Sequence, residues 1–447
     1  DILDKDSTRK KIRKVLKDEN LRDETKSAEK AERDRRKRIE EKQKLYNSIS
    51  EEIIDPIGKE NKECKRLILD FDKKTKEVLV EVDKHFVQIL KPHQIEGIMF
   101  MFNSTIESVE RLKKHKHESG CILAHSMGLG KTLQVIAFLH TIMNNVYIRD
   151  IIQKVLIIVP LNVARNWLTE FDKWLESNNP IPMYETTSTK NLYERIRIMQ
   201  KWRKTGGVLI VTINLFSQMI TGKKFSKRER AQDMRIIREC LLDPGPDIVI
   251  VDEGHLLKND KTIFNCSISQ IRTLRRIILT GTPLQNNLSE YYIMVDFVKP
   301  NLLGTKREFK NRFENPISNG QHIDSTDADV NSMKRRVHVL HQKLKDVINR
   351  HDYSVLVPYL KPKYEFVLTI KLTQVQIDLY KNYLDNFASA SNGKNLLNDF
   401  TVLRYIWNHP ATLVDQCRQK MEKKEDSLKD FLASDNDDID LVTDIKT

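Results

Sequence analysis

Short apolar runs recur through the middle of the chain, and they predict a parallel β-sheet. Each run has four or five residues, most of them β-branched or aliphatic, and stretches with helical patterning separate the runs: 121–124, 155–159, 208–212, 248–251 and 276–280. Because each run is continuously hydrophobic rather than alternating, both faces of these strands should be buried. Strands that alternate with helices predict an α/β fold with a parallel sheet, which binds ligands at the carboxyl ends of its strands.

The segments on either side of this region have different patterns. Residues 67–90 alternate apolar and charged positions, which predicts a β-hairpin ahead of the sheet. Residues 1–50 contain 17 Lys and Arg, 12 Asp and Glu, and no Gly or Pro, which predicts a long charged helix. We interpret that helix as a solvated linker, with a docking or regulatory helix as the alternative. Residues 301–400 predict a helical insertion with one strand inside 356–373, and the acidic residues 421–447 predict a disordered or solvated tail.

Composition narrows the class of protein. The 447 residues include 76 Lys and Arg against 63 Asp and Glu, and the resulting net charge of +13 favours a polyanionic partner. The five cysteines lie far apart, which argues against a disulfide framework or a structural zinc site and favours a reducing compartment. No apolar run approaches the ~18–20 residues of a membrane span. Because the sequence opens at Asp1 rather than Met, we expect a piece of a longer protein.

A phosphate-binding loop follows the first apolar run. The segment Ala-His-Ser-Met-Gly-Leu-Gly-Lys-Thr ends at Thr132 and leads into an apolar helix, which is the strand–loop–helix context of a P-loop. Gly128 and Gly130 allow backbone N–H groups to approach phosphate closely. Lys131 can reach the β- and γ-phosphates, and the hydroxyl of Thr132 can bind Mg²⁺. The usual pattern has Gly where this chain has His125, so the motif alone does not establish the site.

An acidic pair follows the fourth run. Asp252 and Glu253 stand at the end of a buried strand, where carboxylates are costly unless they serve an ion. Asp252 is predicted to hold Mg²⁺, and Glu253 to orient and activate the attacking water. The alternative is a helix N-cap at Asp252 with an ordinary acidic first turn. A P-loop in the same sheet favours the metal site. His255 is interpreted as a coupling or packing residue rather than a metal ligand.

Two other polar segments can be interpreted once a nucleotide site is expected. Thr280 ends the fifth run and Gly281, Thr282 and Gln285 follow it, and we interpret them as a relay that senses the γ-phosphate, with a plain turn as the alternative. Upstream, Gln94 has an amide that could read the edge of an adenine. Its spacing alone marks only an ordinary helix start.

Together these motifs resemble those of the Swi/Snf-related helicase superfamily. The matching segments span about residues 90–300 and are Lys91-Pro92-His93-Gln94, Met127–Thr132, Asp252–His255 with Leu257-Lys258-Asn259, and Leu279–Asn287. Most of that superfamily has an acidic pair where this chain has His125-Ser126, and the departure is similar to the ATRX-type branch. Residues 9–18, 243–247, 301–304 and 315–317 also resemble that branch. The chain is therefore identified as a fragment of an ATRX-type ATPase.

The resemblance implies a nuclear, chromatin-associated ATPase that double-stranded DNA stimulates. Such motors translocate along the duplex and move or exchange histones in nucleosomes without separating the strands. The implied cofactors are ATP and Mg²⁺, and no membrane partner is implied. The implied roles are nucleotide binding by Gln94, Met127, Gly128, Leu129, Gly130, Lys131 and Thr132, catalysis by Lys131, Asp252 and Glu253, Mg²⁺ binding by Thr132 and Asp252, and coupling by His255, Thr280, Gly281, Thr282 and Gln285.

Contacts with DNA are also implied by the resemblance. The superfamily holds the phosphates of one strand with loops that follow the second and third sheet strands, and the matching residues here are Asn162, Asn166, Trp167 and Asn214. The basic run from Lys223 to Arg230 is either a DNA track or a solvated helix face. Contacts of this kind carry no sequence information, so binding should fall steeply with salt and depend little on sequence.

One expected part of the motor does not occur in the sequence. Residues 403–410 resemble the entrance to the second RecA-like lobe, but the arginine-bearing pattern Gln-x-x-x-Arg-x-x-Arg of that lobe is not found. Arginines in that role are worth about 10³–10⁵ in rate in other phosphate-hydrolysing enzymes. We therefore expect that the second lobe is largely missing and is needed in cis. The chain alone should bind ATP but hydrolyse it slowly.

These inferences divide the chain into five predicted domains. They are a charged helical extension (1–55), a β-rich lead-in (56–90), the first RecA-like ATP-binding lobe (91–300), a helical insertion or protrusion (301–400), and the start of the second lobe with the acidic tail (401–447). Two other functions remain open. One is a strand-separating helicase, which the Asp-Glu-Gly-His sequence argues against. The other is a truncated, non-catalytic module that binds chromatin or DNA.

Overall fold

The computed structural model describes most of the chain, in two compact units. The described residues are 15–49, 66–114, 119–175, 181–189, 191–222, 230–257, 259, 262–281, 288–388, 396–416, 418–419 and 421. The first unit comprises Asp1–Leu360 and the second Lys361–Thr447. None of the described helices is both long enough and apolar enough to cross a membrane.

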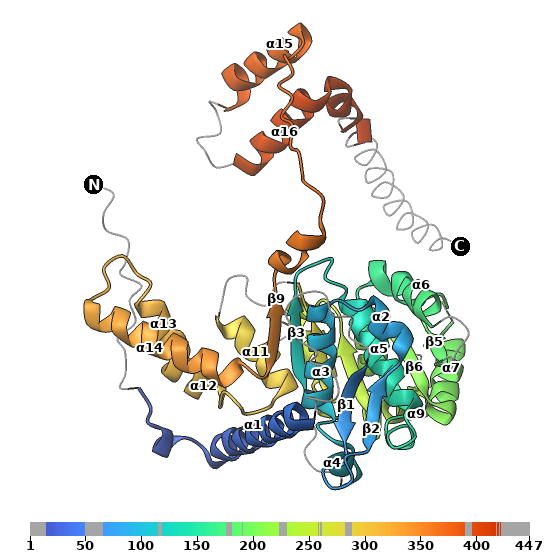
Figure 1. The fold of residues 1–447 in the computed structure, drawn as a ribbon. Coiled ribbons are helices and arrows are strands. Elements are labelled where there is room, and N and C mark those ends of the chain that lie inside the picture. Colours follow the sequence, from blue (N-terminus) through green and yellow to red (C-terminus); the bar gives the residue numbers. More distant parts are fainter. Residues whose placement is uncertain are drawn as a thin grey trace, which may run out of the picture. The chain divides into compact units, whose positions relative to one another are not determined.

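A seven-stranded parallel sheet forms the centre of the first unit (Figure 1). Its strands, in spatial order, are β5 (Met183–Glu185), β6 (Gly207–Thr212), β4 (Lys154–Val159), β7 (Ile248–Val251), β8 (Arg276–Leu279), β3 (Cys121–His125) and β9 (Ile348–His351). Every neighbouring pair is parallel. The predicted α/β fold is confirmed, and all five predicted strands are present. The two edge strands, β5 and β9, were not predicted.

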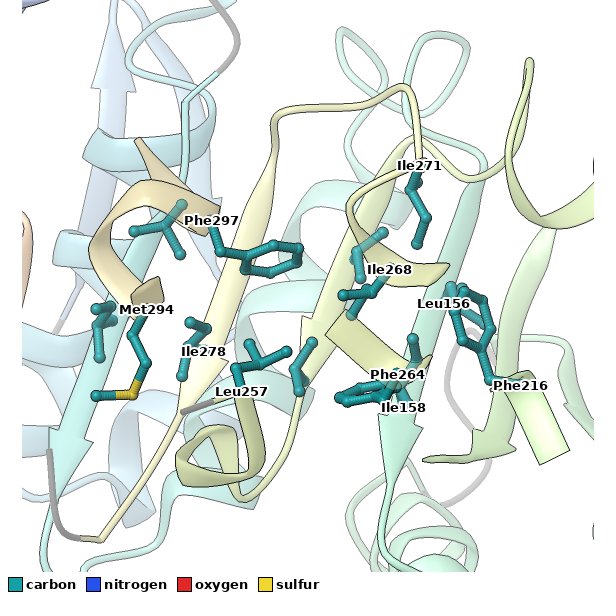
Figure 2. Packing of buried hydrophobic residues seen from close by; sticks show 14 of the residues in the cluster. Leu156, Ile158, Phe216, Leu257, Phe264, Ile268, Ile271, Ile278, Met294 and Phe297 are labelled. Atoms are coloured by element: carbon teal, nitrogen blue, oxygen red, sulfur yellow. The ribbon is translucent and has the colours of Figure 1, made fainter. Parts of the chain in front are cut away.

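Helices cover both faces of the sheet, and alternate strand residues point to opposite layers. Leu156 and Ile158 pack into one core with helices α7 (Leu192–Thr205), α8 (Ile213–Thr221), α9 (Arg230–Leu241), α10 (Ile263–Ile268) and α11 (Leu288–Val298), part of which is drawn in Figure 2. Val155 and Ile157 pack into the other core with α3 (Pro92–Thr105), α5 (Lys131–Asn144) and α6 (Ala164–Trp174). Strands buried on both faces explain the continuous apolar runs.

The predicted hairpin is present beside this second core. Strands β1 (Leu67–Phe71) and β2 (Val78–Val82) pair antiparallel, and their buried residues Leu67, Leu69, Val80 and Val82 belong to the same hydrophobic cluster as α3 and α5. Two short helices, α2 (Lys84–Ile89) and α4 (Val109–Lys113), lie before and after α3 in the chain.

The prediction of a strand within residues 356–373 is wrong. Residues 353–359 form a 3-10 helix, and residues 360–373 form no strand. Apolar side chains in the second segment are exposed, for example Val367 at 92%, because no described strand pairs with it. The strand that does form near this region is β9. Its sequence, Ile-Asn-Arg-His, is too polar to be recognised as a strand from the hydrophobic pattern. β-Propensity reflects packing against neighbours more than an intrinsic backbone preference, and β9 forms because the edge of β3 is there to pair with it.

The predicted helical insertion follows α11. Its helices are α12 (Lys306–Phe309), a π-helical turn (Lys310–Glu314), α13 (Asn315–Asn319) and α14 (Asp327–Leu344). The chain then returns to the sheet as β9. In the second unit, α15 (Gln374–Tyr383) and α16 (Leu396–Asn408) contact one another, and the Gln376 side chain donates to the carbonyls of Ile406 (3.1 Å) and Trp407 (2.8 Å).

The long charged helix, α1 (Asp23–Ile49), is present, but its interpretation as a solvated linker is wrong. Thr25, Glu32 and Arg35 of this helix are buried. Its Glu29 binds Arg312 of the insertion at 3.1 Å, and Lys42 binds Asp70 of the hairpin at 2.7 Å. The docking alternative therefore describes α1, which connects the insertion to the core of the first unit.

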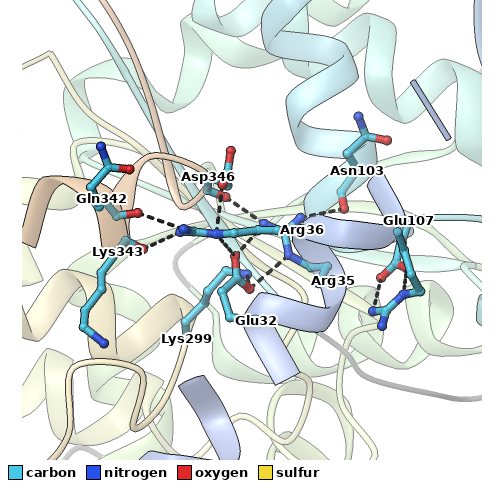
Figure 3. Close-up of polar contacts among 10 residues, drawn as sticks. Glu32, Arg35, Arg36, Asn103, Glu107, Lys299, Gln342, Lys343 and Asp346 are labelled. Carbon is cyan, nitrogen blue, oxygen red and sulfur yellow. Dashed lines mark hydrogen bonds and ion pairs between the residues drawn. The ribbon is translucent and has the colours of Figure 1, made fainter. Parts of the chain in front are cut away.

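A buried ion network anchors the middle of α1 (Figure 3). Glu32 accepts from Arg35 at 2.7 Å and from Lys299, at the end of α11, at 2.6 Å. The Arg35 guanidinium also donates to the backbone carbonyls of Asn103 (3.1 Å) and Asp346 (2.9 Å). One carboxylate thus holds two buried cations, one from its own helix and one from a distant part of the chain.

The balance of charges determines how this network titrates. Burial raises the pKa of Glu32, but the Lys299 charge and the hydrogen bonds from Arg35 outweigh it and lower that pKa to about 2. Burial and the Arg35 charge lower the pKa of Lys299 to about 8 despite the attraction of Glu32. Because the folded-state pKa of Glu32 is depressed, its contribution to stability is present above its ordinary pKa of 4.5 and is lost as the pH falls toward 2.

We expect Glu32→Gln to destabilise the first unit strongly. The substitution keeps the side-chain size but removes the carboxylate that pairs with both buried cations, Arg35 and Lys299, and breaking a buried ion pair in this way costs about 3–5 kcal/mol. Urea unfolding followed by circular dichroism measures the change in the free energy of unfolding.

The control is Glu41→Gln, which removes an exposed carboxylate from the same helix. This variant should unfold like the wild type. The Glu32→Gln variant should also lose less stability than the wild type between pH 4.5 and pH 2. Equal unfolding free energies for the wild type and Glu32→Gln would contradict an anchoring role for the network.

Candidate nucleotide-binding site

Three of the predicted segments lie at the carboxyl edge of the sheet: the phosphate loop, the acidic pair and the turn at Gly281. Strands β7, β8 and β3 are neighbours and run parallel, so the segments that follow them emerge at the same edge. The loop after β3 and the turn after β8 approach closely, since a Cβ atom built on Gly281 would lie 3.4 Å from Met127 Cγ. The edge therefore brings the phosphate loop beside the residues that follow β7 and β8.

The backbone of the loop fits an anion. Gly128 and Gly130 have φ angles of +81° and +75°, which favour glycine, and a Cβ on Gly128 would meet nothing within 4 Å. Within the described residues, the N–H groups of Met127, Gly128 and Gly130 donate to no other protein group. The 14-residue helix α5 begins at Lys131 and adds the N–H groups of its first turn. This combination is the usual phosphate cradle.

Lys131 turns back over the loop. Its Nζ donates to the carbonyl oxygens of His125 (2.8 Å) and Ser126 (3.3 Å). Burial lowers the pKa of Lys131, while the nearby carboxylates of Asp252 and Glu253 oppose that shift. Neutral carbonyls compensate a half-buried ammonium only in part, so a phosphate oxygen would be a better partner for it.

Asp252 is held in a fixed orientation at the end of β7. Its Oδ2 accepts a hydrogen bond from the indole Nε1 of Trp167 at 2.9 Å, and its Oδ1 accepts from the Glu253 N–H at 2.9 Å. The structure therefore does not support the predicted contact between Trp167 and DNA. Its side chain is 1% exposed, too buried to reach a phosphate backbone, and it orients the acidic residue instead. No sequence pattern pointed to this role.

Glu253 has a strained backbone. Its φ angle of +52° is rare for a residue with a side chain, and such conformations cost about 1–3 kcal/mol and gather at functional sites. Its Oε2 lies 3.0 Å from His255 Nδ1. The next residue must be glycine, because a Cβ on Gly254 would lie 2.0 Å from Ile278 Cγ2. The close packing of this turn on β8 presents Glu253 at the sheet edge.

Gln94 contacts the phosphate loop directly. Its Oε1 accepts from the Lys91 N–H at 2.9 Å, and its Nε2 donates to the Leu129 carbonyl at 3.1 Å. A Cβ on Gly130 would lie 2.3 Å from Gln94 Nε2, so this glycine is required for the contact. The Oε1 and Nε2 atoms of Gln94 can each make one more hydrogen bond. That Gln94 recognises the edge of an adenine stays a prediction.

The oxygen donors near the loop fit a magnesium ion. Mg²⁺ prefers oxygen ligands, usually one or two carboxylates together with phosphate and water. The hydroxyl of Thr132, in the first turn of α5, and the carboxylate of Asp252 would supply them. Strand β7, which ends just before Asp252, is separated from β3 by β8 alone, and the Asp252 charge opposes the lowering of the Lys131 pKa by burial.

The other predicted residues are only partly placed. Asn162, Asn166 and Asn214 are exposed and follow β4 and β6, which are neighbours in the sheet. Thr280 is fully buried, and its N–H donates to the Leu123 carbonyl at 3.1 Å. Outside the described residues lie Thr282, Gln285 and positions 223–229 of the basic run.

Comparison with known proteins gives a family and several relatives. The family model of the SNF2-related domain matches residues 93–412, more than half of the chain. The Transcriptional regulator ATRX homolog of Drosophila melanogaster is 45% identical and covers 90% of this chain. Transcriptional regulator ATRX of Homo sapiens is 43% identical over 96%, and Protein CHROMATIN REMODELING 20 of Arabidopsis thaliana is 40% identical over 82%. The predicted resemblance to the ATRX type is confirmed.

The chain matches only part of each relative. It spans 31% of the Drosophila protein, 18% of the human protein and 25% of the Arabidopsis protein. Among solved structures, the Sulfolobus solfataricus SWI2/SNF2 ATPase core in complex with dsDNA is similar at 23% identity with a TM-score of 0.42. That match covers 76% of this chain and 65% of the other.

We expect Lys131→Ala to weaken ATP binding about 10- to 100-fold, because a charge-assisted hydrogen bond contributes about 1.5–3 kcal/mol. Isothermal titration calorimetry with a non-hydrolysable ATP analogue and Mg²⁺ measures the dissociation constant.

Lys84→Ala serves as the control, since it removes an exposed lysine at the start of α2. This variant should bind the analogue like the wild type. An unchanged dissociation constant for Lys131→Ala would show that the loop does not bind the triphosphate.

Proposed function

The chain belongs to the SNF2-related family, and we propose that its first unit is the ATP-binding part of a chromatin-remodelling motor that translocates on double-stranded DNA. The observation that carries this proposal is the loop after β3: among the described residues, its N–H groups at Met127, Gly128 and Gly130 donate to no other protein group, and the Lys131 ammonium folds back onto the same loop. The names of the relatives, a transcriptional regulator and a chromatin-remodelling protein, support the same class of function.

Each residue of the site has a role in this proposal. The loop N–H groups and Lys131 bind the β- and γ-phosphates, and Gln94 reads the adenine. Thr132 and Asp252 hold Mg²⁺, which neutralises charge on the phosphates when bound. Glu253 orients the attacking water and takes its proton. We assign coupling between nucleotide and movement to His255, Thr280, Gly281, Thr282 and Gln285.

The partners follow from the same proposal. Asn162, Asn166 and Asn214 contact the phosphates of one DNA strand from exposed positions after β4 and β6. The net charge of +13 favours such a polyanion. The protein acts in the nucleus on nucleosomes and other chromatin proteins, in keeping with the names of its relatives.

We also propose the five-part domain organisation, with residues 91–300 as the first RecA-like lobe and 401–447 as the start of the second. Because arginines of a second lobe stabilise the transferring phosphoryl group, this chain alone should bind ATP and hydrolyse it slowly.

The deciding experiment compares the ATPase activity of this chain with that of the same chain extended through a second RecA-like lobe, with and without duplex DNA. We expect slow hydrolysis by the chain alone and fast, DNA-stimulated hydrolysis by the extended protein. In the extended protein, Glu253→Gln should lower the turnover number by about 10²–10⁴ while ATP still binds, because it removes the general base.

Glu290→Gln, a change of the same kind in the first turn of α11, is the control and should leave turnover unchanged. Rapid, DNA-stimulated hydrolysis by the chain alone would contradict the need for a second lobe. Normal hydrolysis by Glu253→Gln would contradict the assigned role of Glu253.

DNA binding should depend on salt and hardly on sequence. Neutralisation of about four phosphates by Lys and Arg side chains would weaken binding roughly a hundredfold when the salt rises from about 50 to 200 mM. Fluorescence anisotropy with two duplexes of unrelated sequence measures it. Asn214→Asp should weaken binding by adding repulsion, whereas Asn20→Asp, at an exposed position of the N-terminal segment, should not. A flat salt response would contradict phosphate tracking.

A further inference from the structure

His125 takes the place of the first glycine in the P-loop pattern, and it is completely buried behind the loop. Its ring packs against those of His351 (centroids 4.9 Å apart) and His93 (6.2 Å), and the latter two rings are 6.0 Å from each other. Across the described ranges, no group of three or more His, Cys, Asp or Glu is arranged to hold a metal ion.

Two amide side chains define the state of the His125 ring. Its Nε2 lies 2.5 Å from Asn349 Oδ1, and its Nδ1 lies 3.3 Å from Gln134 Nε2. An amide oxygen accepts and an amide nitrogen donates, so the ring carries its hydrogen on Nε2 and accepts at Nδ1. Burial lowers the pKa of His125 to about 4, which keeps the ring neutral. A proton on Nδ1 would face another donor.

Strand β9 is tied to the phosphate loop by both backbone and side chain. The Ser126 N–H donates to the His351 carbonyl at 3.0 Å, one residue beyond the His125–Asn349 side-chain contact. On the other side of the ring, Gln134 Nε2 also lies 3.3 Å from the carbonyls of Leu129 and Gly130. A continuous set of hydrogen bonds thus runs from β9 through His125 and Gln134 to the carbonyls of Leu129 and Gly130 in the loop.

A glycine on α3 leaves the space that this arrangement needs. A Cβ on Gly97 would lie 2.0 Å from Gln134 Oε1 and 3.3 Å from His125 Cε1. Glycine inside a helix costs about 0.5–1 kcal/mol relative to alanine. Its presence in the middle of α3 is explained by the close approach of Gln134 and His125.

We propose that Asn349 and His125 are a positioning pair, through which β9 holds the phosphate loop in the shape that binds the nucleotide. The proposal deepens the proposed function and rests on ATP binding at this loop. Strand β9 is the last strand before the first unit ends at Leu360. The pair therefore connects the nucleotide site to the segment of chain that leads out of this unit.

The test uses the full chain with Asn349→Leu, which keeps the side-chain size but removes the acceptor, and Asn349→Asp, which keeps an acceptor oxygen. The carboxylate of Glu96 is a neighbour of Asn349 and would repel an aspartate introduced at position 349. The Glu96 side chain is 58% exposed, so solvent screens this repulsion. Arg350→Gln, an exposed change on the same strand, is the control. Calorimetry measures binding of a non-hydrolysable ATP analogue with Mg²⁺, and hydrogen exchange measures protection of the Ser126 N–H without nucleotide.

We expect Asn349→Leu to weaken binding about five- to tenfold, the value of one buried hydrogen bond, and to speed exchange at Ser126 by a similar factor. Asn349→Asp and Arg350→Gln should stay within about twofold of the wild type. In a His125→Ala background, Asn349→Leu should have no further effect, because the pair is already broken. A structural role unrelated to His125 would instead make the two effects additive.

Each failure has a distinct result. A wild-type chain that does not bind the analogue overturns the proposed function, while the exchange measurement still tests the pair. Unchanged Ser126 exchange in a folded Asn349→Leu variant, an Asn349→Asp variant as weak as Asn349→Leu, or additive effects in the cycle each overturn the positioning pair.

Discussion

Parallel pairing of β7, β8 and β3 is the constraint on which the rest of the site depends. Parallel strands all end at one edge, so three segments that are far apart in sequence meet there. The phosphate loop follows β3, Gly281 follows β8 and Asp252 follows β7. The carboxylates of Asp252 and Glu253 then act on the pKa of Lys131, although about 120 residues separate them in the chain. Without this pairing, the glycines and the acidic pair would be unrelated turns.

A second constraint holds the unit together from outside the sheet. Helix α1 carries few apolar residues, yet it docks on the rest of the first unit through buried ion pairs, in which the Glu32 carboxylate binds both Arg35 and Lys299. Buried ion pairs gain little net stability over apolar contacts, but they require specific partners. The same helix contacts the insertion through Glu29 and the hairpin through Lys42. It therefore fixes the relative positions of elements from both ends of the unit.

The sequence predicted the parts of the fold that rest on local pattern. Strands buried on both faces are continuous apolar runs, and the phosphate loop has its own residue spacing. It did not predict β9, because Ile-Asn-Arg-His becomes a strand only beside the edge of β3. The docking of α1 was missed because Glu32 and Arg35 look like an ordinary solvated pair until Lys299 joins them from 267 residues away.

The site shows the same limit. Lys131, Asp252 and Glu253 were identified from their neighbours in sequence, and the structure brings them to one edge. Trp167 was assigned to DNA because the family resemblance implies DNA contacts in the loop after the second strand, whereas the indole turns inward to Asp252. The partners of His125 are Gln134 and Asn349, and the second of these lies 224 residues away, so only the fold could reveal them. Contacts between distant segments are what a one-dimensional pattern lacks.

A crystal structure of the chain soaked with Mg²⁺ and a non-hydrolysable ATP analogue tests the central claim most directly. We expect the triphosphate to lie on the N–H groups of residues 127–132, with the Lys131 ammonium moved from the His125 carbonyl to a phosphate oxygen and Mg²⁺ between the phosphates and Asp252. An empty loop, or an analogue bound elsewhere while Lys131 still contacts the His125 carbonyl, would contradict the account.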